Sequence, residues 1–355
     1  MAKINKHIEI VTSTVRGLSS MGQVSAAAAQ AVLARHYTQV RVTIINTLPE
    51  LDTLVARRPD VVFLGMKFLP SDPALGFHDS SKIWLSEYLS NAGIVCTGSD
   101  YRAHNLELNK ELAKQRVLQA GLSTARFYTA RVNELLTQDD IVLTYPLFIK
   151  PSNKGGGVGI NTNSLVHTFA QLQAKVCSIT DTLGSDSLIE EYLPGREFSV
   201  AILKNVGVGS YKAMPLELVA PMNDLGGSFL SARIKAADTE QHFAVTDATL
   251  RAKLTALAMD AFDALGARDY GRIDIRLDAA GMPHFLEANL LPSLLEGYGN
   301  FPKACLLNQG IDYESMLLQI VELALARETT GVQTAIDAFS VPQIISTFGV
   351  ALETV

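Results

Sequence analysis

Charged and amide side chains at alternating positions make the segment 270–292 a candidate metal-binding site. It reads YGRIDIRLDAAGMPHFLEANLLP and predicts two antiparallel strands. The turn between them falls at Asp278–Met282, where Gly281 is free to take a positive φ.

Four side chains of this hairpin could act together. Arg272 and Asp274 lie two residues apart in the first strand, and Glu287 and Asn289 lie two apart in the second. Each pair therefore shares one face of its strand. Carboxylate and amide oxygens suit Mg²⁺ held with nucleotide phosphates, and the guanidinium can stabilise a developing oxyanion. The alternative is the solvated face of a half-buried sheet.

A glycine-rich loop is the second candidate for chemistry. In FIKPSNKGGGVGI, a predicted strand ends at Lys150 and is followed by Gly155, Gly156, Gly157 and Gly159. Backbone N–H groups of such a loop can fold over phosphate oxygens, and the lysine would add a fixed positive charge. No Gly-Lys-Ser/Thr follows, so it is not a Walker A loop. A flexible hairpin without a ligand is the alternative.

The segment Leu188–Val200, LIEEYLPGREFSV, could bind the base and sugar of a nucleotide. An apolar strand edge near Glu190, Tyr192 and Leu193 exposes backbone groups that can hydrogen-bond to an adenine ring. The carboxylate of Glu197 follows a few residues later and can accept hydrogen bonds from ribose hydroxyls. An exposed acidic hairpin is the competing interpretation.

Composition excludes several classes of protein. The chain has 355 residues, a net charge of −6, and apolar residues at 48% of the sequence. No basic run suggests nucleic acid as a partner, and no apolar run is long enough to span a membrane. Three widely spaced cysteines indicate reduced thiols. Because the N-terminus has no apolar segment of signal-peptide length, we expect a cytoplasmic protein.

Strands and helices are expected to alternate over the first hundred residues, which predicts a parallel sheet with helices on both faces. The expected strands are His7–Val11, Val40–Ile45, Pro59–Leu64 and Ile94–Cys96, and the expected helices are Ser19–Ala34, Leu51–Arg57 and His78–Ala92.

The rest of the chain predicts longer helices and one long connection. We expect one helix over Asp100–Ala120, others over Leu165–Ser178, Leu250–Leu265 and Asp312–Ala326, and a loop over Val219–Thr239 that closes over a site. The predicted divisions are a parallel α/β domain at 1–98, a central domain at 99–187, a C-terminal domain at 188–326, and a tail at 327–355.

Four of these segments together resemble the ATP-grasp carboxylate–amine ligases, and most closely the D-alanine–D-alanine ligase family. They occur in the family's order and approximate spacing over most of residues 90–325, and read VCTGSDYRAHNLELNKELAKQ, FIKPSNKGGGVGI, EEYLPGREFSV and GRIDIRLDAAGMPHFLEAN. The resemblance implies an ATP-grasp fold of three α/β-type domains, including a Rossmann-like N-terminal one, with ATP between the central and C-terminal domains.

The resemblance also implies roles for individual residues. Lys110 and Lys150 would contact ATP phosphates, and the glycine loop would close over them. Glu190, Tyr192 and Leu193 would bind adenine. Glu197 would bind the ribose. Asp274, Glu287 and Asn289 would bind two Mg²⁺ ions, with Mn²⁺ as a possible substitute. Arg272 would stabilise the tetrahedral intermediate, and Arg233 or Lys235 would contact the γ-phosphate.

The reaction implied by the resemblance has two steps and small-molecule substrates. The carboxylate of one substrate attacks the γ-phosphate of ATP to give an acyl phosphate, which the amine of a second substrate then attacks. The products are an amide or dipeptide, ADP and phosphate. A homodimer is a further expectation from the family.

The sequence departs from the family where it should bind amino acids. Met21 stands at the position of an acidic residue that holds the first substrate's ammonium. Glycines replace the serines of the phosphate loop, and Ile234 stands near the place of a tyrosine. After the metal strand, the candidate substrate-binding positions are Ser293, Tyr298 and Gly299.

Three interpretations of function stay open at this point. The leading one is an active ligase with altered substrates, in a specialised pathway. The second is an authentic D-alanine–D-alanine ligase of peptidoglycan synthesis. The third is a non-catalytic nucleotide-binding protein, against which the retention of Arg272 argues, because binding ATP alone does not require that cation.

Overall fold

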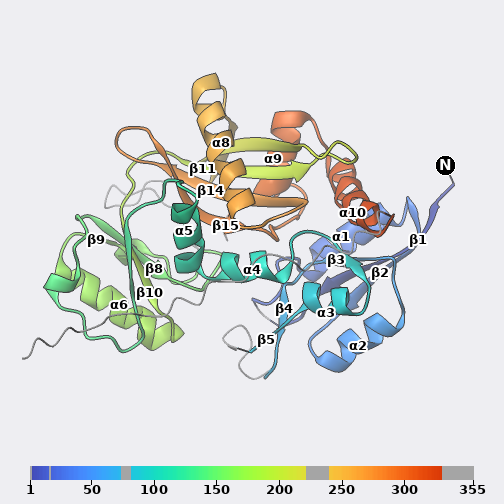
Figure 1. Cartoon of the computed structure of the whole chain (residues 1–355), viewed down its shortest axis with the longest axis horizontal. Coiled ribbons are helices and arrows are strands. Elements are labelled where there is room, and N and C mark those ends of the chain that lie inside the picture. Colours follow the sequence, from blue (N-terminus) through green and yellow to red (C-terminus); the bar gives the residue numbers. More distant parts are fainter. Residues whose placement is uncertain (1, 16, 73–80, 221–239, 330–355) are drawn as a thin grey trace, which may run out of the picture.

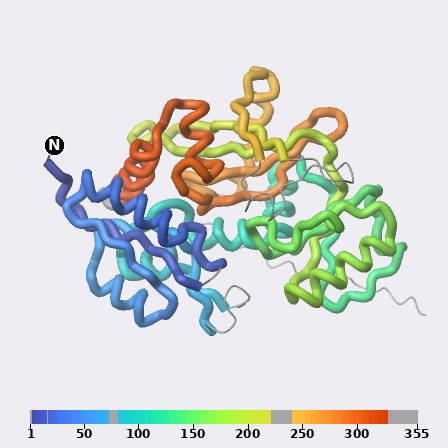
Figure 2. Tube along the Cα trace, turned by 180° about the vertical axis from the view of Figure 1, so that it is seen from behind, coloured from blue at the N-terminus to red at the C-terminus, as the bar shows by residue number. Residues whose placement is uncertain are grey.

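The structure, a computed structural model, describes residues 2–15, 17–72, 81–220 and 240–329. It contains an N-terminal, a central and a C-terminal sheet, with helices packed against each (Figure 1). The N-terminal and central sheets lie at opposite ends of the molecule, and the C-terminal sheet extends along one side of both (Figure 2).

The N-terminal sheet is parallel, as the sequence predicts. Its order is β2-β1-β3-β6, with β1 at Ile4–Thr12, β2 at Tyr37–Ile44, β3 at Val61–Leu64 and β6 at Val95–Cys96. All four residues of β3 are buried, as expected for a parallel strand covered on both faces. The helices beside it are α1 at Gln23–Leu33, α2 at Leu48–Ala56 and α3 at Leu85–Asn91.

The helix expected over His78–Ala92 is wrong in its first part. Residues 73–80 lie outside the described residues, Lys82–Trp84 forms strand β5, and only the remainder is helical, as α3. β5 pairs antiparallel with β4 at Phe68–Pro70. The aromatic side chains of Phe68 and Trp84 pack edge to face across this ribbon, 5.6 Å apart, and this contact favours a strand over a longer helix.

The central sheet carries the segments expected to contact phosphate and base. Its order is β7-β10-β8-β9, with β7 at Phe127–Ala130, β10 at Ser187–Glu191, β8 at Leu147–Pro151 and β9 at Leu165–Val166. Helix α6 at Phe169–Leu183 packs on this sheet. The helix expected from Leu165 therefore begins later, because Thr168 caps its first turn by accepting from the N–H of Gln171.

The C-terminal sheet is antiparallel, in the order β13-β12-β11-β14-β15. Its strands are β11 at Glu197–Lys204, β12 at Tyr211–Val219, β13 at Gln241–Ala244, β14 at Tyr270–Leu277 and β15 at Pro283–Asn289. Helix α8 at Ala248–Ala264 covers one face and α9 at Asn300–Gln309 covers the other. Buried residues of α10, at Tyr313–Thr329, share a core with the N-terminal sheet.

The long helix expected over Asp100–Ala120 is two helices, which corrects the prediction. Helix α4 at Tyr101–Leu108 ends at Asn109, whose φ of −109° and ψ of 95° are not helical. The Asn109 side chain then caps α5 at Lys110–Gln119 by accepting from the N–H of Leu112. Asparagine is among the best N-cap residues, so this change of direction has a local cause.

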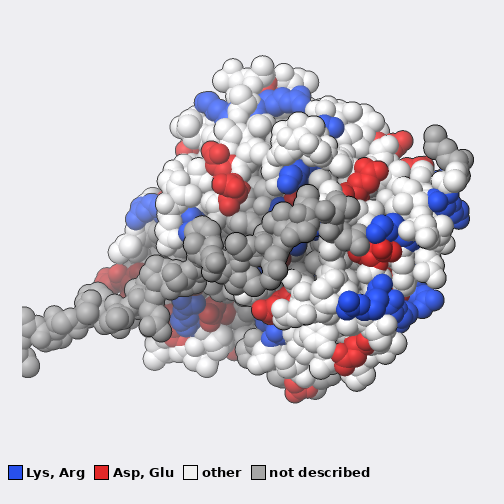
Figure 3. All heavy atoms as spheres, turned by 45° about the vertical axis from the view of Figure 1, so that its right-hand side comes forward, with Lys and Arg blue, Asp and Glu red and all other residues white. Residues whose placement is uncertain are grey.

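The predicted loop and the predicted tail fall partly outside the residues that the structure describes. The predicted loop over Val219–Thr239 begins where β12 ends, and residues 221–239 lie outside the described residues, as does the tail from residue 330. Through the described ranges, no helix is long and apolar enough to cross a membrane. On the face shown in Figure 3, acidic and basic side chains are interspersed.

Candidate active site

The hairpin of β14 and β15 forms as the sequence predicts. The two strands pair antiparallel, with Arg272 opposite Asn289 and Asp274 opposite Glu287. Gly281 in the connecting turn has a φ of 77°. The four side chains expected to act together are therefore adjacent in the sheet.

Asp274 is the best-connected member of this group. Its Oδ1 accepts from Ser199 Oγ at 2.7 Å and from Arg272 Nε at 2.9 Å. Its Oδ2 accepts from Arg272 Nη2 at 2.9 Å and from Asn289 Nδ2 at 3.0 Å. The guanidinium thus makes a two-point ion pair with the carboxylate, and both side chains are largely buried.

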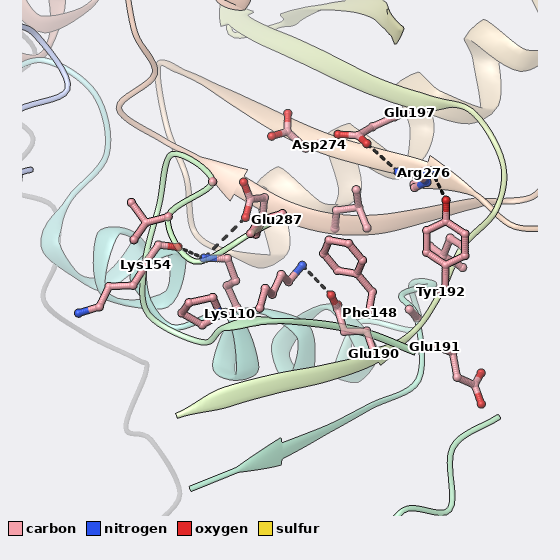
Figure 4. A pocket seen from close by; sticks show the side chains of 18 residues that line it. Lys110, Phe148, Lys154, Glu190, Glu191, Tyr192, Glu197, Asp274, Arg276 and Glu287 are labelled. Atoms are coloured by element: carbon pink, nitrogen blue, oxygen red, sulfur yellow. Dashed lines mark hydrogen bonds and ion pairs between the residues drawn. The ribbon is translucent and has the colours of Figure 1, made fainter. Parts of the chain in front are cut away.

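A pocket lies between the central sheet and the β14–β15 hairpin (Figure 4). Its non-atom space, which opens to solvent, is about 810 Å³. Among the predicted site residues, those that line it are Lys110, Lys150, Gly157, Glu190, Tyr192, Leu193, Glu197, Asp274 and Glu287. The structure thus brings the candidate phosphate, base, ribose and metal residues to one cavity.

The other predicted residues have different positions. Gly155 and Gly156 adjoin lining residues in the chain, and Arg272 and Asn289 hydrogen-bond to Asp274, but these four do not line the pocket. Met21, Ser293, Tyr298 and Gly299 do not line it either. Arg233 and Lys235 are outside the described residues.

The Glu190 carboxylate is buried between two lysines. Its Oε1 lies 2.5 Å from Lys114 Nζ and its Oε2 lies 2.6 Å from Lys150 Nζ. All three side chains are less than a tenth exposed. Lys114 Nζ also donates to Thr124 Oγ1 at 2.6 Å. Lys150, expected at the phosphates, is therefore engaged with Glu190 in this structure.

Electrostatics favour the charged forms of Glu190 and Lys150. Burial alone would raise the pKa of Glu190, but Lys114 and Lys150 outweigh it and hold the pKa below its usual value. Burial likewise opposes the charge on Lys150, and the neighbouring Glu190 and Glu287 carboxylates raise its pKa nonetheless. Burial lowers the pKa of Lys114 despite its pairing with Glu190.

The glycine-rich loop follows β8 and is held from two sides. Lys110 Nζ donates to the backbone carbonyl of Lys154, and Lys175 Nζ donates to that of Gly159 at 2.7 Å. Gly159 has a φ of 76°, and a Cβ there would lie 2.6 Å from Pro151 Cγ, so no other residue fits without a shift. Lys110 Nζ also lies 3.7 Å from Glu287 Oε2, which links the loop to the hairpin.

Sequence reasoning missed several residues in or beside the pocket. Lys114 follows Lys110 by four residues, and this spacing, which places both lysines on one helix face, was the available signal. Arg276 continues the alternation of Arg272 and Asp274 along β14 and lines the pocket. The further lining residues are Ala125, Phe148, Pro151, Lys154, Val158, Ile160, Glu191 and Leu286.

A second buried acid, Glu107, connects the N-terminal sheet to the hairpin. Its Oε1 accepts from Lys67 Nζ at 2.6 Å and from the backbone N–H of Leu290 at 2.9 Å. Its Oε2 lies 3.1 Å from His104 Nδ1. Burial opposes its charge, but Lys67 and His104 hold the pKa of Glu107 below its usual value. Because Leu290 directly follows Asn289, Glu107 fixes the end of the candidate metal strand.

The residues predicted to bind amino acids do not gather at this cavity. Met21 is 2% exposed and belongs to the core of the N-terminal sheet, where its Cβ lies 2.9 Å from the position that a Cβ of Gly65 would take. Ser293, Tyr298 and Gly299 lie in the connection between β15 and α9, which Gly299 precedes as its N-cap.

Replacing Lys114 tests the buried ion pairs. We expect Lys114→Met to lower the free energy of unfolding by about 3 kcal/mol, because Glu190 loses one of two partners in a buried site. Lys114→Met with Glu190→Gln should cost less than the sum of the single changes, because the two groups interact directly. Urea unfolding measures both, with the exposed Gln115→Met as the control for helix α5. Additive effects would contradict the coupling.

Comparison with known proteins identifies the family of this chain. Residues 117–322 match the family model described as "D-ala D-ala ligase C-terminus". A D-alanine–D-alanine ligase of Bordetella petrii is 32% identical over 66% of this chain and 69% of its own length. The uncharacterized protein y4sG of Sinorhizobium fredii is 32% identical over 67% of this chain and 69% of its own.

A solved structure supports the fold over nearly the whole chain. The D-alanine–D-alanine ligase of Bacillus anthracis, in complex with ATP, superposes with a TM-score of 0.70 at 20% identity. The match covers 92% of this chain and 99% of that one, which confirms the predicted ATP-grasp architecture. The family model and the relatives together show that this chain is a member of the D-alanine–D-alanine ligase family, and thus an ATP-dependent ligase that forms an amide bond.

Proposed function

We propose that this protein is an ATP- and Mg²⁺-dependent carboxylate–amine ligase whose substrates are not two D-alanines. The observation that carries the proposal is a contrast between two sets of predicted residues. Nine residues with candidate nucleotide or metal roles line one pocket, whereas Met21, at the position of the family's ammonium-binding acid, is a buried core residue.

The nucleotide would occupy the pocket with its base toward residues 191–193. Phe148 and Tyr192 stack there with ring centroids 6.4 Å apart, and they offer an aromatic wall to an adenine. Glu197 would accept a ribose hydroxyl. Lys110 and Lys154 lie at the opposite end of the pocket from Tyr192 (Figure 4), and they would face the phosphates together with Gly157, which also lines the pocket.

The donor set beside the phosphates suits Mg²⁺. Asp274 and Glu287 face each other across the hairpin and both line the pocket, and Asn289 adds an amide. Few protein oxygens are needed, because Mg²⁺ keeps waters and takes further ligands from phosphate. These residues would hold two ions, or Mn²⁺ in their place, which offset the charge of the triphosphate when bound.

The reaction is the one that membership of this ligase family implies. A substrate carboxylate attacks the γ-phosphate of ATP and forms an acyl phosphate with release of ADP. The amine of the second substrate attacks the acyl carbon and expels phosphate. Arg272, paired here with Asp274, is the cation available to the oxyanion of that second step. Arg233 or Lys235 stays a prediction for the γ-phosphate.

Altered specificity rests on the amino-acid half of the molecule. With methionine in place of the acid, an α-ammonium on the first substrate would lack its charged partner and lose about 1–3 kcal/mol of binding. A first substrate without a free α-amine, or with the amine elsewhere, fits better. Tyr298 and Gly299, in place of a Ser-Leu pair, change the expected contacts of the second substrate.

A substrate panel tests this proposal. Phosphate release from ATP and Mg²⁺ is measured with D-alanine, other D- and L-amino acids, and amine-free carboxylates, singly and in pairs. Mass spectrometry identifies each product. We expect little release with D-alanine and clear release with another pair, and Arg272→Ala should abolish it. Efficient formation of D-alanyl-D-alanine would contradict altered specificity, and release unaffected by Arg272→Ala would contradict the role of this cation.

We expect ATP binding to depend on pH because of the ammonium group of Lys154. Burial, and then repulsion from Lys82, lowers the pKa of Lys154 to about 8. A triphosphate beside this ammonium favours its charged form, so binding takes up a proton, and affinity falls as the pH rises above about 8. Calorimetry in buffers of different ionisation enthalpy measures the uptake.

The control for this measurement is Lys253→Met, an exposed lysine of helix α8 that does not line the pocket. Lys253→Met should leave the proton uptake intact, and Lys154→Met should remove it. Uptake that persists in Lys154→Met would assign the titration to another group.

A further inference from the structure

Arg276 is a buried cation in the pocket that the reaction described above does not use. It lies two residues beyond Asp274 on β14, so alternation places it on the same face of the strand as Arg272 and Asp274. Its exposed fraction is only 6%. A guanidinium so deeply buried needs a compensating anion and an orienting contact.

Both contacts come from residues with proposed nucleotide roles. Arg276 Nη1 donates to Glu197 Oε2 at 2.9 Å, and Nη2 donates to the Tyr192 hydroxyl at 3.0 Å. The guanidinium also lies over the Tyr192 ring, 5.1 Å from its centroid. Figure 4 shows Glu197 and Tyr192 pointing to Arg276 from two sides.

These two residues bound the crossover between the central and C-terminal sheets. The chain leaves β10 at Glu191 and enters β11 at Glu197, and β14 holds the residues between them. Gly195 N–H donates to the carbonyl of Leu277 at 3.0 Å, and Leu277 N–H donates to that of Arg196 at 3.0 Å. A Cβ on Gly195 would lie 2.6 Å from the Leu277 oxygen, so the approach is close. Arg276 therefore contacts both ends of a crossover whose backbone is already held at Gly195 and Arg196.

We infer that Arg276 is a positioning residue that sets how the protein recognises the ribose of its nucleotide. The inference rests on the proposed function, in which Glu197 accepts a ribose hydroxyl. The ion pair fixes Glu197 with Oε2 toward the guanidinium, so one rotamer of the carboxylate is presented to the sugar. The cation also neutralises Glu197, which would otherwise repel a triphosphate in the same pocket.

Nucleotide binding by the full-length protein tests this without knowledge of the amino-acid substrates. Calorimetry with Mg²⁺ compares ATP, 2′-deoxy-ATP and 3′-deoxy-ATP. The natural chain should bind at least one deoxy form more weakly than ATP. Arg276→Met should weaken ATP about tenfold and weaken that deoxy form much less, so that discrimination is lost. Arg276→Lys should retain part of it, because an ammonium can still pair with Glu197.

Two further variants separate the possible failures. Arg196→Met removes an exposed side chain of the crossover that pairs with Glu217 of β12 and leaves the backbone contact to Leu277 in place, so it should change neither affinity nor discrimination. Glu197→Gln should abolish discrimination. The proposed role of Glu197 would be overturned if Glu197→Gln still discriminated between ATP and the deoxy form, or if the natural chain did not discriminate between them. A different result would overturn only the inference about Arg276. In that result, Glu197→Gln loses discrimination between ATP and the deoxy form, but both Arg276 variants either weaken all nucleotides equally or change none of the affinities.

Discussion

The charge on Glu190 is the constraint on which the pocket depends. A carboxylate that is 3% exposed can remain ionised only with cationic partners, and here the two lysines come from different elements, Lys114 from α5 and Lys150 from β8. Lys114 also donates to the Thr124 hydroxyl, which in turn donates to the carbonyl of Phe285 in β15 at 2.7 Å. The two walls of the pocket, one from each sheet, are therefore joined through one set of buried charges.

A comparable connection holds the other side of the hairpin. Glu107 pairs with Lys67 from the N-terminal part and accepts from the backbone of Leu290, next to Asn289. Buried charges of this kind add little net stability, but they cost much when one partner is lost, so they favour one arrangement over others. In this molecule that arrangement places Asp274 and Glu287 opposite the glycine-rich loop.

The sequence predicted what depends on local spacing and missed what depends on partners far along the chain. The alternation at Arg272, Asp274, Glu287 and Asn289 was enough to predict the hairpin and its shared face. The break at Asn109 was missed because Asp100–Ala120 is otherwise helical in composition. Helix α9 was missed too, where Pro302 sits in the first turn, a position that a helix tolerates.

In the candidate site, too, the contacts that the sequence did not predict join residues far apart in the chain. The residues that meet Glu190, Glu197 and Glu107 come from distant positions, as with Arg276 and Glu197, which are 79 residues apart. No local pattern indicates such pairs. The burial of Met21 was equally unpredictable, because it depends on the packing of its loop against Gly65 at the end of β3.

We propose that one pocket holds the nucleotide between the glycine-rich loop and the β14–β15 hairpin. The most direct measurement is a crystal structure with Mg²⁺ and a non-hydrolysable ATP analogue. We expect the base against residues 191–193, the phosphates near Lys110 and Gly157, and metal on Asp274 and Glu287. A nucleotide bound elsewhere, or a metal that neither carboxylate contacts, would contradict it.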